Sequence, residues 1–456
     1  MRLGKQNLRA CPESINYLFP ILVLLALAPP SPAQTSDPVL MSEIHRIRAI
    51  DNHSHPPRIV GPGERDDEFD ALPCDPLEPT TPNTMTRPEN PVYLAAWKYL
   101  WGYQYSDRSE AHVRSLIRTK QRIRREQGDH YAVWVLGRLG IETELANRVA
   151  MGRGLVAPEF RWVPFDDALL FPLNNESLAG ETPDRGFFFG RETMLLERYR
   201  RELGVAREPE TLAEFTARVV TAELERQKQL GAVAIKFEAA YLRSLDFEPQ
   251  DGTDAATIYA KYVRGGIPDK AEYTRLEDYL FRYVAAEAGR LNLPVHIHTG
   301  AGCGGYFQLS GSNPLLLEPV LNDPRLRKTV FVLIHGGAGP FTRAMSYLLM
   351  KPNVYTDLSE QTWLESPRRL SEVLRDWLEW YPEKVMFGTD LFPGGAPEID
   401  WEEIGWQTAE TARQALGIAL SGMIADGEIS RERAIEIARM VLRENAIKLY
   451  GWTDRH

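Results

Sequence analysis

The sequence contains few cysteines for its length. Three occur among 456 residues, at positions 11, 74 and 303. This count excludes a disulfide framework as the basis of the fold, so burial of apolar side chains must stabilise the core. Cys74 and Cys303 lie in the body of the chain, and the sequence leaves open whether they form one bridge or remain two free thiols.

Basic residues are outnumbered by acidic ones. Lys and Arg total 53 against 63 Asp and Glu, which gives a formal net charge of −10. Because nucleic-acid binding needs a positively charged face, this balance argues against nucleic acid as a partner. A hydrophobic fraction of 43% and a charged fraction of 25% are typical of globular proteins and exclude a disordered chain.

No run after residue 33 is long and apolar enough to predict a transmembrane helix. Before it, basic residues at positions 2, 5 and 9 precede an apolar run over 17–28, and Ser31 and Ala33 fit the small-residue rule for cleavage before Gln34. We therefore expect residues 1–33 to be a secretory signal peptide. The mature chain would then be periplasmic or secreted, without a stable membrane anchor; the alternative is an uncleaved N-terminal anchor.

Short apolar runs alternate with amphipathic segments along the remaining chain. The runs predict strands at residues 47–50, 140–144, 161–164, 232–237, 293–298, 330–335, 354–358 and 385–388. Helical patterns lie between several of them, and the last one closes the chain over 416–450 with a break near Gly427. The alternation predicts an α/β fold, a (β/α)8 TIM barrel over residues 34–456, with a helical and loop insertion after the first strand at about 56–130. A doubly wound sheet is disfavoured because no glycine-rich nucleotide loop follows the first strand.

Metal-binding side chains cluster at the ends of the predicted strands, where barrel enzymes carry catalytic groups. They are His53, His55, His296, His298, His335 and Asp390. Strand residues two apart share a face, so His53 and His55 can bind one metal ion, and imidazole favours zinc and related metals. A carboxylate at Asp390 can bind a metal and accept a proton from its water. For His296, a buried structural role and a substrate contact remain open.

Lys236 ends the apolar run AVAIKF, and three roles remain open for it. It could be carbamylated and bridge two metal ions, stay cationic and pair with Asp390 or a substrate carboxylate, or lie at the rim. Glu238 is a lesser candidate ligand. Tyr241 and Arg243 are candidate substrate contacts; a guanidinium there would suit a carboxylate-bearing small molecule, and a surface arginine is the alternative. The aromatic stretch 93–105 is a further candidate for substrate contact.

At these residues the sequence resembles the amidohydrolase superfamily, and in particular the amidohydrolase domain that some fungal proteins carry fused to glutamine synthetase. The segments that carry the resemblance are DNHSHP (51–56), IKFEAAYLR (235–243), LPVHIHTGAG (293–302), NPLLLEPVL (313–321), VLIHGGAGPFTRAMSYL (332–348), PNVYTDLS (352–359) and FGTDLFP (387–393). Their order and rough spacing match from the first strand to the eighth, least clearly over residues 56–230.

The resemblance implies a divalent metal centre of one or two ions, most readily zinc, with ligands His53, His55, His298, His335 and Asp390. In binuclear branches a carbamylated lysine at the position of Lys236 is also a ligand. It further implies a hydrolase of an amide or other C–N bond, with an ester or lactone next, that uses a metal-activated water and Asp390 as general base, with His335 helping to polarise the carbonyl. The N-terminal signal would make this hydrolase an exported one. Decarboxylases and sugar-acid isomerases resemble the same superfamily and form the first alternative. A non-catalytic metal- or ligand-binding barrel is the second.

Overall fold

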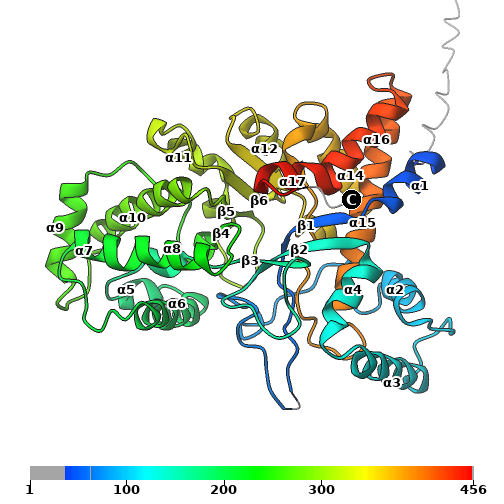
Figure 1. The fold of residues 1–456 in the computed structure, drawn as a ribbon, viewed down its shortest axis with the longest axis horizontal. Coiled ribbons are helices and arrows are strands. Elements are labelled where there is room, and N and C mark those ends of the chain that lie inside the picture. The colour runs from blue at the N-terminus through cyan, green and yellow to red at the C-terminus, as the bar shows by residue number, and fades with distance from the viewer. Residues whose placement is uncertain (1–35, 62, 454–456) are drawn as a thin grey trace, which may run out of the picture. The chain divides into compact units, whose positions relative to one another are not determined.

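Eight parallel strands surround a common centre in this computed structural model, which describes residues 36–61 and 63–453 (Figure 1). The strands are β1 (Ala49–Ser54), β2 (Ile141–Asn147), β3 (Phe160–Val163), β4 (Ile235–Phe237), β5 (Val295–Gly300), β6 (Phe331–Ala338), β7 (Val354–Asp357) and β8 (Val385–Met386). Each overlaps or directly follows one of the runs expected from the sequence. The described residues belong to the unit Ser36–His456, and the predicted signal peptide lies outside them.

The strands form two ladders, β1-β2-β3 and β4-β5-β6-β7-β8, which backbone hydrogen bonds join into a closed barrel. On one side Lys236 N donates to Pro164 O at 2.8 Å, and Asp166 N donates to Lys236 O at 2.9 Å. On the other side Asn52 N donates to the Phe387 carbonyl at 2.9 Å. This closure confirms the predicted (β/α)8 barrel.

The barrel interior is apolar below its carboxyl end. A buried cluster contains Ile50, Leu145, Val163, Ala234, Val332, Ile334, Met386 and Ala446. The first seven come from the barrel strands or their immediate ends, and Ala446 comes from the last helix of the chain. Strands buried on both faces read as apolar runs, which is why the sequence located them correctly.

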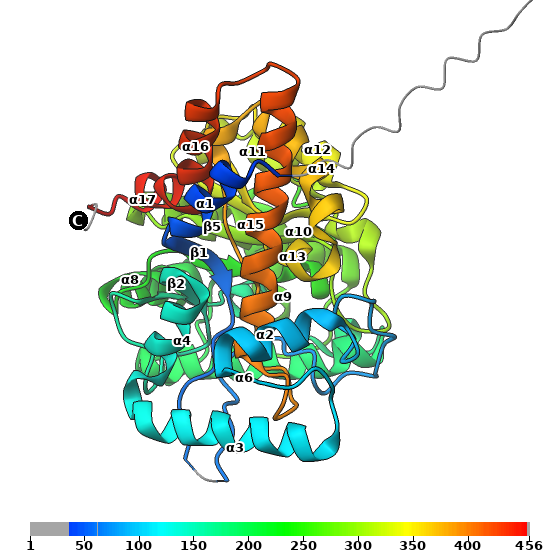
Figure 2. The same cartoon turned by 90° about the vertical axis from the view of Figure 1, so that its right-hand side faces the viewer.

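Helices surround the strands and connect them (Figures 1 and 2). They are α1 (Pro38–Arg46), α2 (Pro91–Trp101), α3 (Glu110–Gln127), α4 (Tyr131–Leu139), α5 (Glu176–Ala179), α6 (Pro183–Glu202), α7 (Leu212–Phe215), α8 (Ala222–Gln229), α9 (Gly252–Tyr262), α10 (Lys270–Leu291), α11 (Glu318–Leu321), α12 (Thr342–Leu348), α13 (Gln361–Leu364), α14 (Pro367–Leu378), α15 (Trp401–Ala425), α16 (Arg431–Arg439) and α17 (Asn445–Tyr450). Gly427, at φ +76°, lies between α15 and α16, where the sequence predicted a break. Within the described residues, no helix has the length and apolar character needed to cross a membrane.

Residues 56–130, the stretch expected as an insertion, contain a long loop followed by α2 and α3. Helix α2 packs against α15 (Figure 2). Trp101 Nε1 donates to Glu403 Oε1 at 2.6 Å, and Lys120 of α3 donates to Glu403 Oε2 at 2.7 Å. These aromatic residues therefore anchor the segment to α15, and the structure does not support the substrate contacts expected for them.

Candidate metal centre and active-site pocket

Four histidines and one aspartate meet at the carboxyl end of the barrel. The His53 ring lies 5.0 Å from the rings of His55 and His335, and the His298 and His335 rings are 4.6 Å apart, centroid to centroid. Asp390 Oδ1 lies 3.2 Å from His53 Nε2 and 3.5 Å from His55 Nε2. All five side chains are buried. The structure thus brings together five of the six residues predicted as metal ligands, and the sixth, Lys236, lies directly beneath them.

A chain of hydrogen bonds behind His335 determines which of its ring nitrogens carries the proton. Asp357 accepts hydrogen bonds from Asn52 Nδ2 at 2.7 Å, His335 N at 3.0 Å, and both the backbone nitrogen and the hydroxyl of Ser359. The Ser359 hydroxyl has one hydrogen and gives it to Asp357, so it accepts from His335 Nδ1 at 2.9 Å. His335 Nε2 is then left with a lone pair.

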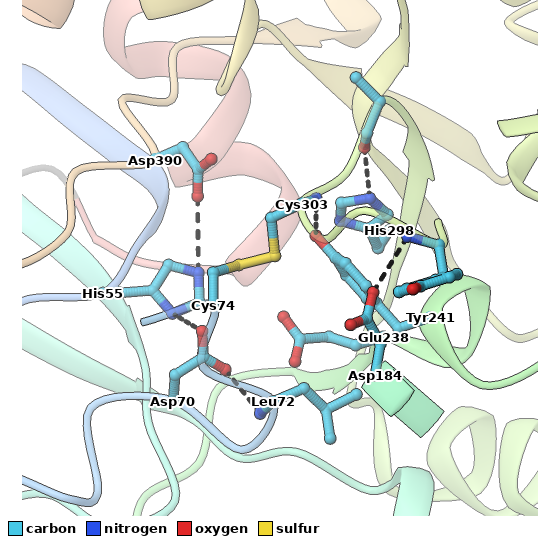
Figure 3. The surroundings of a disulfide bond; sticks show 12 residues. His55, Asp70, Leu72, Cys74, Asp184, Glu238, Tyr241, His298, Cys303 and Asp390 are labelled. Carbon is cyan, nitrogen blue, oxygen red and sulfur yellow. Dashed lines mark hydrogen bonds and ion pairs between the residues drawn. A yellow bond between two sulfur atoms is a disulfide. The ribbon is translucent and has the colours of Figure 1, made fainter. Parts of the chain in front are cut away.

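His298 is oriented by an acceptor in the same way, and a carboxylate lies near His55. His298 Nε2 lies 2.6 Å from the carbonyl oxygen of Ala301, which can only accept, so His298 Nδ1 keeps the lone pair. His55 Nδ1 faces Asp70 Oδ2 at 3.6 Å, while its Nε2 faces Asp390 (Figure 3). A carboxylate behind a histidine is the usual way in which proteins fix a metal-binding imidazole.

Burial sets the charge of these groups. It lowers the pKa of His53 and His335 well below the usual range, and burial together with the charge of Lys236 lowers the pKa of His298 to about 3. Burial alone would raise the pKa of Asp390, but the neighbouring His335 and His55 imidazoles hold it below its usual value. Neutral imidazoles and an ionised carboxylate are the forms that bind metals, so the donor set fits a divalent ion such as zinc.

Lys236 lies on the floor of the site. Its side chain is fully buried, and its Nζ is 3.3 Å from His53 Nε2 and 4.0 Å from Glu238 Oε1. The rim position considered for it is therefore wrong. The cationic and the carbamylated forms both suit this location.

His296 lies deeper than the site. It pairs in register with Lys236 on the neighbouring strand, and its Nε2 is 2.8 Å from the hydroxyl of Tyr450, which donates to Asn52 Oδ1 at 2.6 Å. Its exposed fraction is 0%, and it does not line the pocket. His296 is thus a buried, hydrogen-bonded structural residue, and the hypothesis of a substrate contact is not supported.

Arg243 already has carboxylate partners within the chain. Its Nη1 donates to Glu277 at 2.8 Å, and its Nη2 donates to Asp278 at 2.7 Å. Its guanidinium also lies 4.4 Å from the ring centre of Phe247. These contacts tie the end of the β4 segment to α10. The structure therefore corrects the expectation that Arg243 contacts a substrate carboxylate.

A pocket of about 170 Å³ opens onto the histidine cluster. It is lined by His53, His55, Phe69, Asp70, Leu72, Cys74, Asp75, Glu238, Tyr241, Cys303, His298, His335, Glu360, Trp363, Asp390 and Phe392. Tyr241, a predicted substrate contact, lies in this wall with its ring 4.8 Å from that of His298. Cys74 and Cys303 form a disulfide here, which resolves the question the sequence left open.

Strained backbone marks the same place. Of the described residues other than glycine, four have positive φ, and three of them line the pocket: His335 at +67°, Glu360 at +61° and Asp390 at +55°. Such conformations are costly and persist where the surrounding structure enforces them, often at functional sites. The fourth, Asn292, ends a helix.

Sequence reasoning did not single out Asp70, Asp75 or Glu360. The first two lie in the long loop after β1, which has no periodic pattern, and Glu360 follows β7. The position of Glu360 just beyond a barrel strand is the signal that could have found it. Nothing local marks Asp70 or Asp75, because folding of the loop alone brings them to the pocket.

Comparisons with known proteins agree with this architecture. A family model described as amidohydrolase matches residues 197–452, more than half of the chain. Protein fluG of Emericella nidulans is 28% identical over 237 residues, which are 49% of this chain and 26% of that protein. The chain therefore spans about a quarter of the length of this curated relative.

Solved structures share the fold at low sequence identity. Glucuronate isomerase from Caulobacter crescentus has a TM-score of 0.61 at 13% identity, covering 92% of this chain and 94% of that one. A provisionally assigned metal-dependent hydrolase from Lactobacillus casei has a TM-score of 0.58 at 16% identity, covering 90% and 97%. The chain belongs to the amidohydrolase family.

Proposed function

We propose that the protein is a metal-dependent hydrolase of a small molecule, cleaving an amide or other C–N bond, with an ester or lactone as the next choice. The observation that carries the proposal is the orientation of the histidines. Acceptors behind His298 and His335 leave each of these two rings with an unused lone pair, and Asp70 Oδ2 lies 3.6 Å from His55 Nδ1. With His53 and Asp390, these rings would hold the ion, for which zinc is our first choice.

When bound, the metal would lower the pKa of a water molecule toward neutrality and polarise the scissile carbonyl. Asp390 Oδ1 would take the proton from that water and pass it to the leaving nitrogen. Its lowered pKa keeps this carboxylate ionised and ready to accept at neutral pH. Because Ser359 accepts the Nδ1 proton of His335, we assign His335 a metal-binding role and not a hydrogen-bond donor role.

Lys236 is best described as a cation in this proposal. Burial raises the pKa values of Asp357, Glu238 and Glu360, and a cationic Lys236 opposes this rise at each of them, as it also helps to lower the pKa of Asp390. A carbamate would add a negative charge to this acidic surrounding, and a second metal ion would then be needed to balance it. We therefore favour a single metal ion.

Isomerisation is the second candidate, because two structural neighbours, from Caulobacter crescentus and Thermotoga maritima, are sugar-acid isomerases. Such substrates carry a carboxylate. The residues described as lining the pocket include no lysine or arginine, so a substrate carboxylate could bind only to the metal or through hydrogen bonds. This lining favours hydrolysis over that alternative.

The test uses zinc-loaded protein and a panel of small amides, esters, lactones and sugar acids in ¹⁸O-labelled water. Hydrolysis predicts products that together gain one labelled water, whereas isomerisation leaves the mass unchanged and decarboxylation releases carbon dioxide. Asp390→Asn should lower kcat about 10²–10⁴-fold, and Glu248→Gln, an exposed control outside the pocket, should not. Turnover without uptake of water would contradict the proposal.

We also propose that the protein is exported, as the N-terminal sequence predicts. The Cys74–Cys303 disulfide supports this, because disulfides persist mainly in oxidising compartments such as the periplasm.

A further inference from the structure

The charges around the pocket are of one sign. Its described lining contains five carboxylates, from Asp70, Asp75, Glu238, Glu360 and Asp390, and no lysine or arginine. Asp390 belongs to the proposed metal centre, which leaves four carboxylates without a role in the proposed hydrolysis. A set of acidic residues is not a site by itself, so the partners of each carboxylate decide what it can do.

Two of these carboxylates have unpartnered oxygens. Glu238 Oε2 and Glu360 Oε2 are buried and have no hydrogen-bond partner among the described residues, and each side chain belongs to a residue with an exposed fraction of 4%. Lys236 Nζ lies 4.0 Å from the other oxygen of Glu238, so what Glu238 lacks is a hydrogen-bond donor to Oε2. A buried polar oxygen without a donor is costly, and a ligand that supplies the donor removes that cost. Glu360 is also held in the left-handed region, at φ +61°, which fixes its place in the pocket wall.

The corner around Glu238 is the more strongly acidic one. Asp70 and Glu238 lie close together in Figure 3, within reach of His55 Nδ1. Leu72 N donates to the Asp70 carboxylate at 3.0 Å and fixes it, and Glu238 N donates to Asp167 at 2.8 Å, which fixes the backbone of Glu238. This corner therefore offers a fixed pair of acceptors beside the metal centre.

A second metal ion would be the obvious occupant of that corner, but the chemistry of His55 argues against it. Its Nε2 faces Asp390 and the first centre, and its Nδ1 faces Asp70. One imidazole can serve both sites only after losing both of its protons. An occupant that brings hydrogen-bond donors of its own avoids this requirement.

The remaining wall of the pocket is apolar. Phe69, Leu72, Trp363 and Phe392 line it together with the disulfide. Such a wall suits a short hydrocarbon segment, and an aromatic face also attracts an organic cation. The combination of acidic corner and apolar wall describes a ligand with a positively charged end on an apolar stem.

We propose that the substrate carries a protonated amine, which binds to Glu238 and Asp70, while its scissile bond lies at the metal centre. This inference rests on the proposed function and specifies its substrate class as amides of amino compounds that retain a free ammonium group. A charge-assisted hydrogen bond from an ammonium to a buried carboxylate gives both affinity and orientation.

Binding of three matched probes tests the inference without any turnover. The probes are butylamine, which is protonated at pH 7, 1-butanol and butyrate, each titrated into zinc-loaded protein by ligand-observed NMR. We expect butylammonium to bind at least about tenfold more tightly than butyrate, although the metal ion itself attracts the carboxylate. Equal or tighter binding of butyrate would overturn the inference.

Variants separate the role of Glu238 from a loss of folding. Glu238→Gln should weaken butylammonium about tenfold and leave 1-butanol unchanged, whereas Glu238→Asp retains the charge and should retain the preference for the amine. Glu248→Gln is the matched control and should behave as the wild type. Unchanged amine binding in Glu238→Gln would refute the inference. So would a second zinc ion that binds the wild type and is lost in this variant.

The outcome is distinguishable from failure of the proposed function. If butylammonium binds as expected but no amide, ester or lactone is hydrolysed, the hydrolase assignment fails and the amine site stands. If neutral or acidic substrates are hydrolysed with no preference for an amine, the hydrolase assignment stands and this inference fails.

Discussion

The backbone nitrogen of Asp390 donates a hydrogen bond to the carbonyl oxygen of His53 at 2.8 Å. The same approach places Asp390 Oδ1 3.2 Å from His53 Nε2. Asp51 supports the junction by accepting from Thr389 N at 2.9 Å and from the Thr389 hydroxyl. Closing the barrel between its first and last strands therefore also assembles the proposed metal centre, so the centre can form only in the folded chain.

Removing either histidine of the first strand should remove the metal. We expect His53→Ala and His55→Ala each to weaken zinc binding by more than about 100-fold, because even residues that only support a ligand contribute up to that factor. Metal content per chain, measured after dialysis, checks this, with circular dichroism as the control for folding. Full zinc content in both variants would contradict the proposed centre.

The number of metal ions distinguishes the two forms of Lys236. A cationic lysine on the floor of the site predicts about one zinc per chain in protein purified without chelators, since no ligand then bridges a second ion. Metal analysis and the intact mass under native conditions measure this. A value near two, together with added carbon dioxide on Lys236, would favour the carbamylated form and a binuclear centre.

The ion pair of Asp66 and Arg148 should stabilise the loop after β1. Arg148 Nη1 and Nη2 each donate to Asp66 at 2.9 Å, and Arg148 Nη1 also holds Pro56 O at 2.7 Å. Breaking a buried pair typically costs about 3–5 kcal/mol, so we expect Asp66→Asn to lower the free energy of unfolding by that order. Urea unfolding in the presence of chelator measures it. Asp129→Asn, which breaks an exposed pair with Arg153, should cost far less, because solvent screens that pair.

The same pair should make the free energy of unfolding depend on pH in the acidic range. Burial raises the pKa of Asp66, but the hydrogen bond and charge of Arg148 outweigh it and leave the pKa below the usual value. A lowered folded pKa contributes stability that is present above the unfolded pKa of about 3.9 and is lost as the pH falls through the folded pKa. Below about pH 4 the difference in stability between the wild type and Asp66→Asn should therefore shrink. A constant difference from pH 7 to pH 3 would contradict this.

Reduction of the disulfide should loosen the pocket wall. Cys74 and Cys303 are 229 residues apart in sequence, and the bridge joins the loop that carries Asp70 to the segment after β5. We expect Cys74→Ser with Cys303→Ser to lose about 2–5 kcal/mol of stability, as is usual when a native bridge is removed. Thermal unfolding with and without reductant checks this: reductant should destabilise the wild type and leave the double variant unchanged.

Export predicts a defined N-terminus. If residues 1–33 are a signal peptide, protein recovered from the exported fraction should begin near Gln34. Intact-mass measurement decides the question. A mass that includes residues 1–33 would support the uncleaved anchor instead.

The sequence by itself determined the barrel and most of the metal centre. Buried parallel strands are continuous apolar runs, so they are visible locally, and the residues that follow them must reach one end of a barrel. His53, His55, His298, His335 and Asp390 were found for this reason, and the structure brings them together. The break at Gly427 is equally local, since glycine readily adopts positive φ.

Only the tertiary structure decided the partners of the other polar residues. Arg243 and His296 follow or belong to barrel strands as the catalytic candidates do, yet the first pairs with α10 and the second with Tyr450 near the end of the chain. Asp70 and Cys74 lie in a loop without periodicity and reach the pocket through folding of that loop. Strand patterns report the local backbone, whereas the neighbours of a side chain depend on segments hundreds of residues away. The acidic lining of the pocket results from such distant segments coming together in the folded chain.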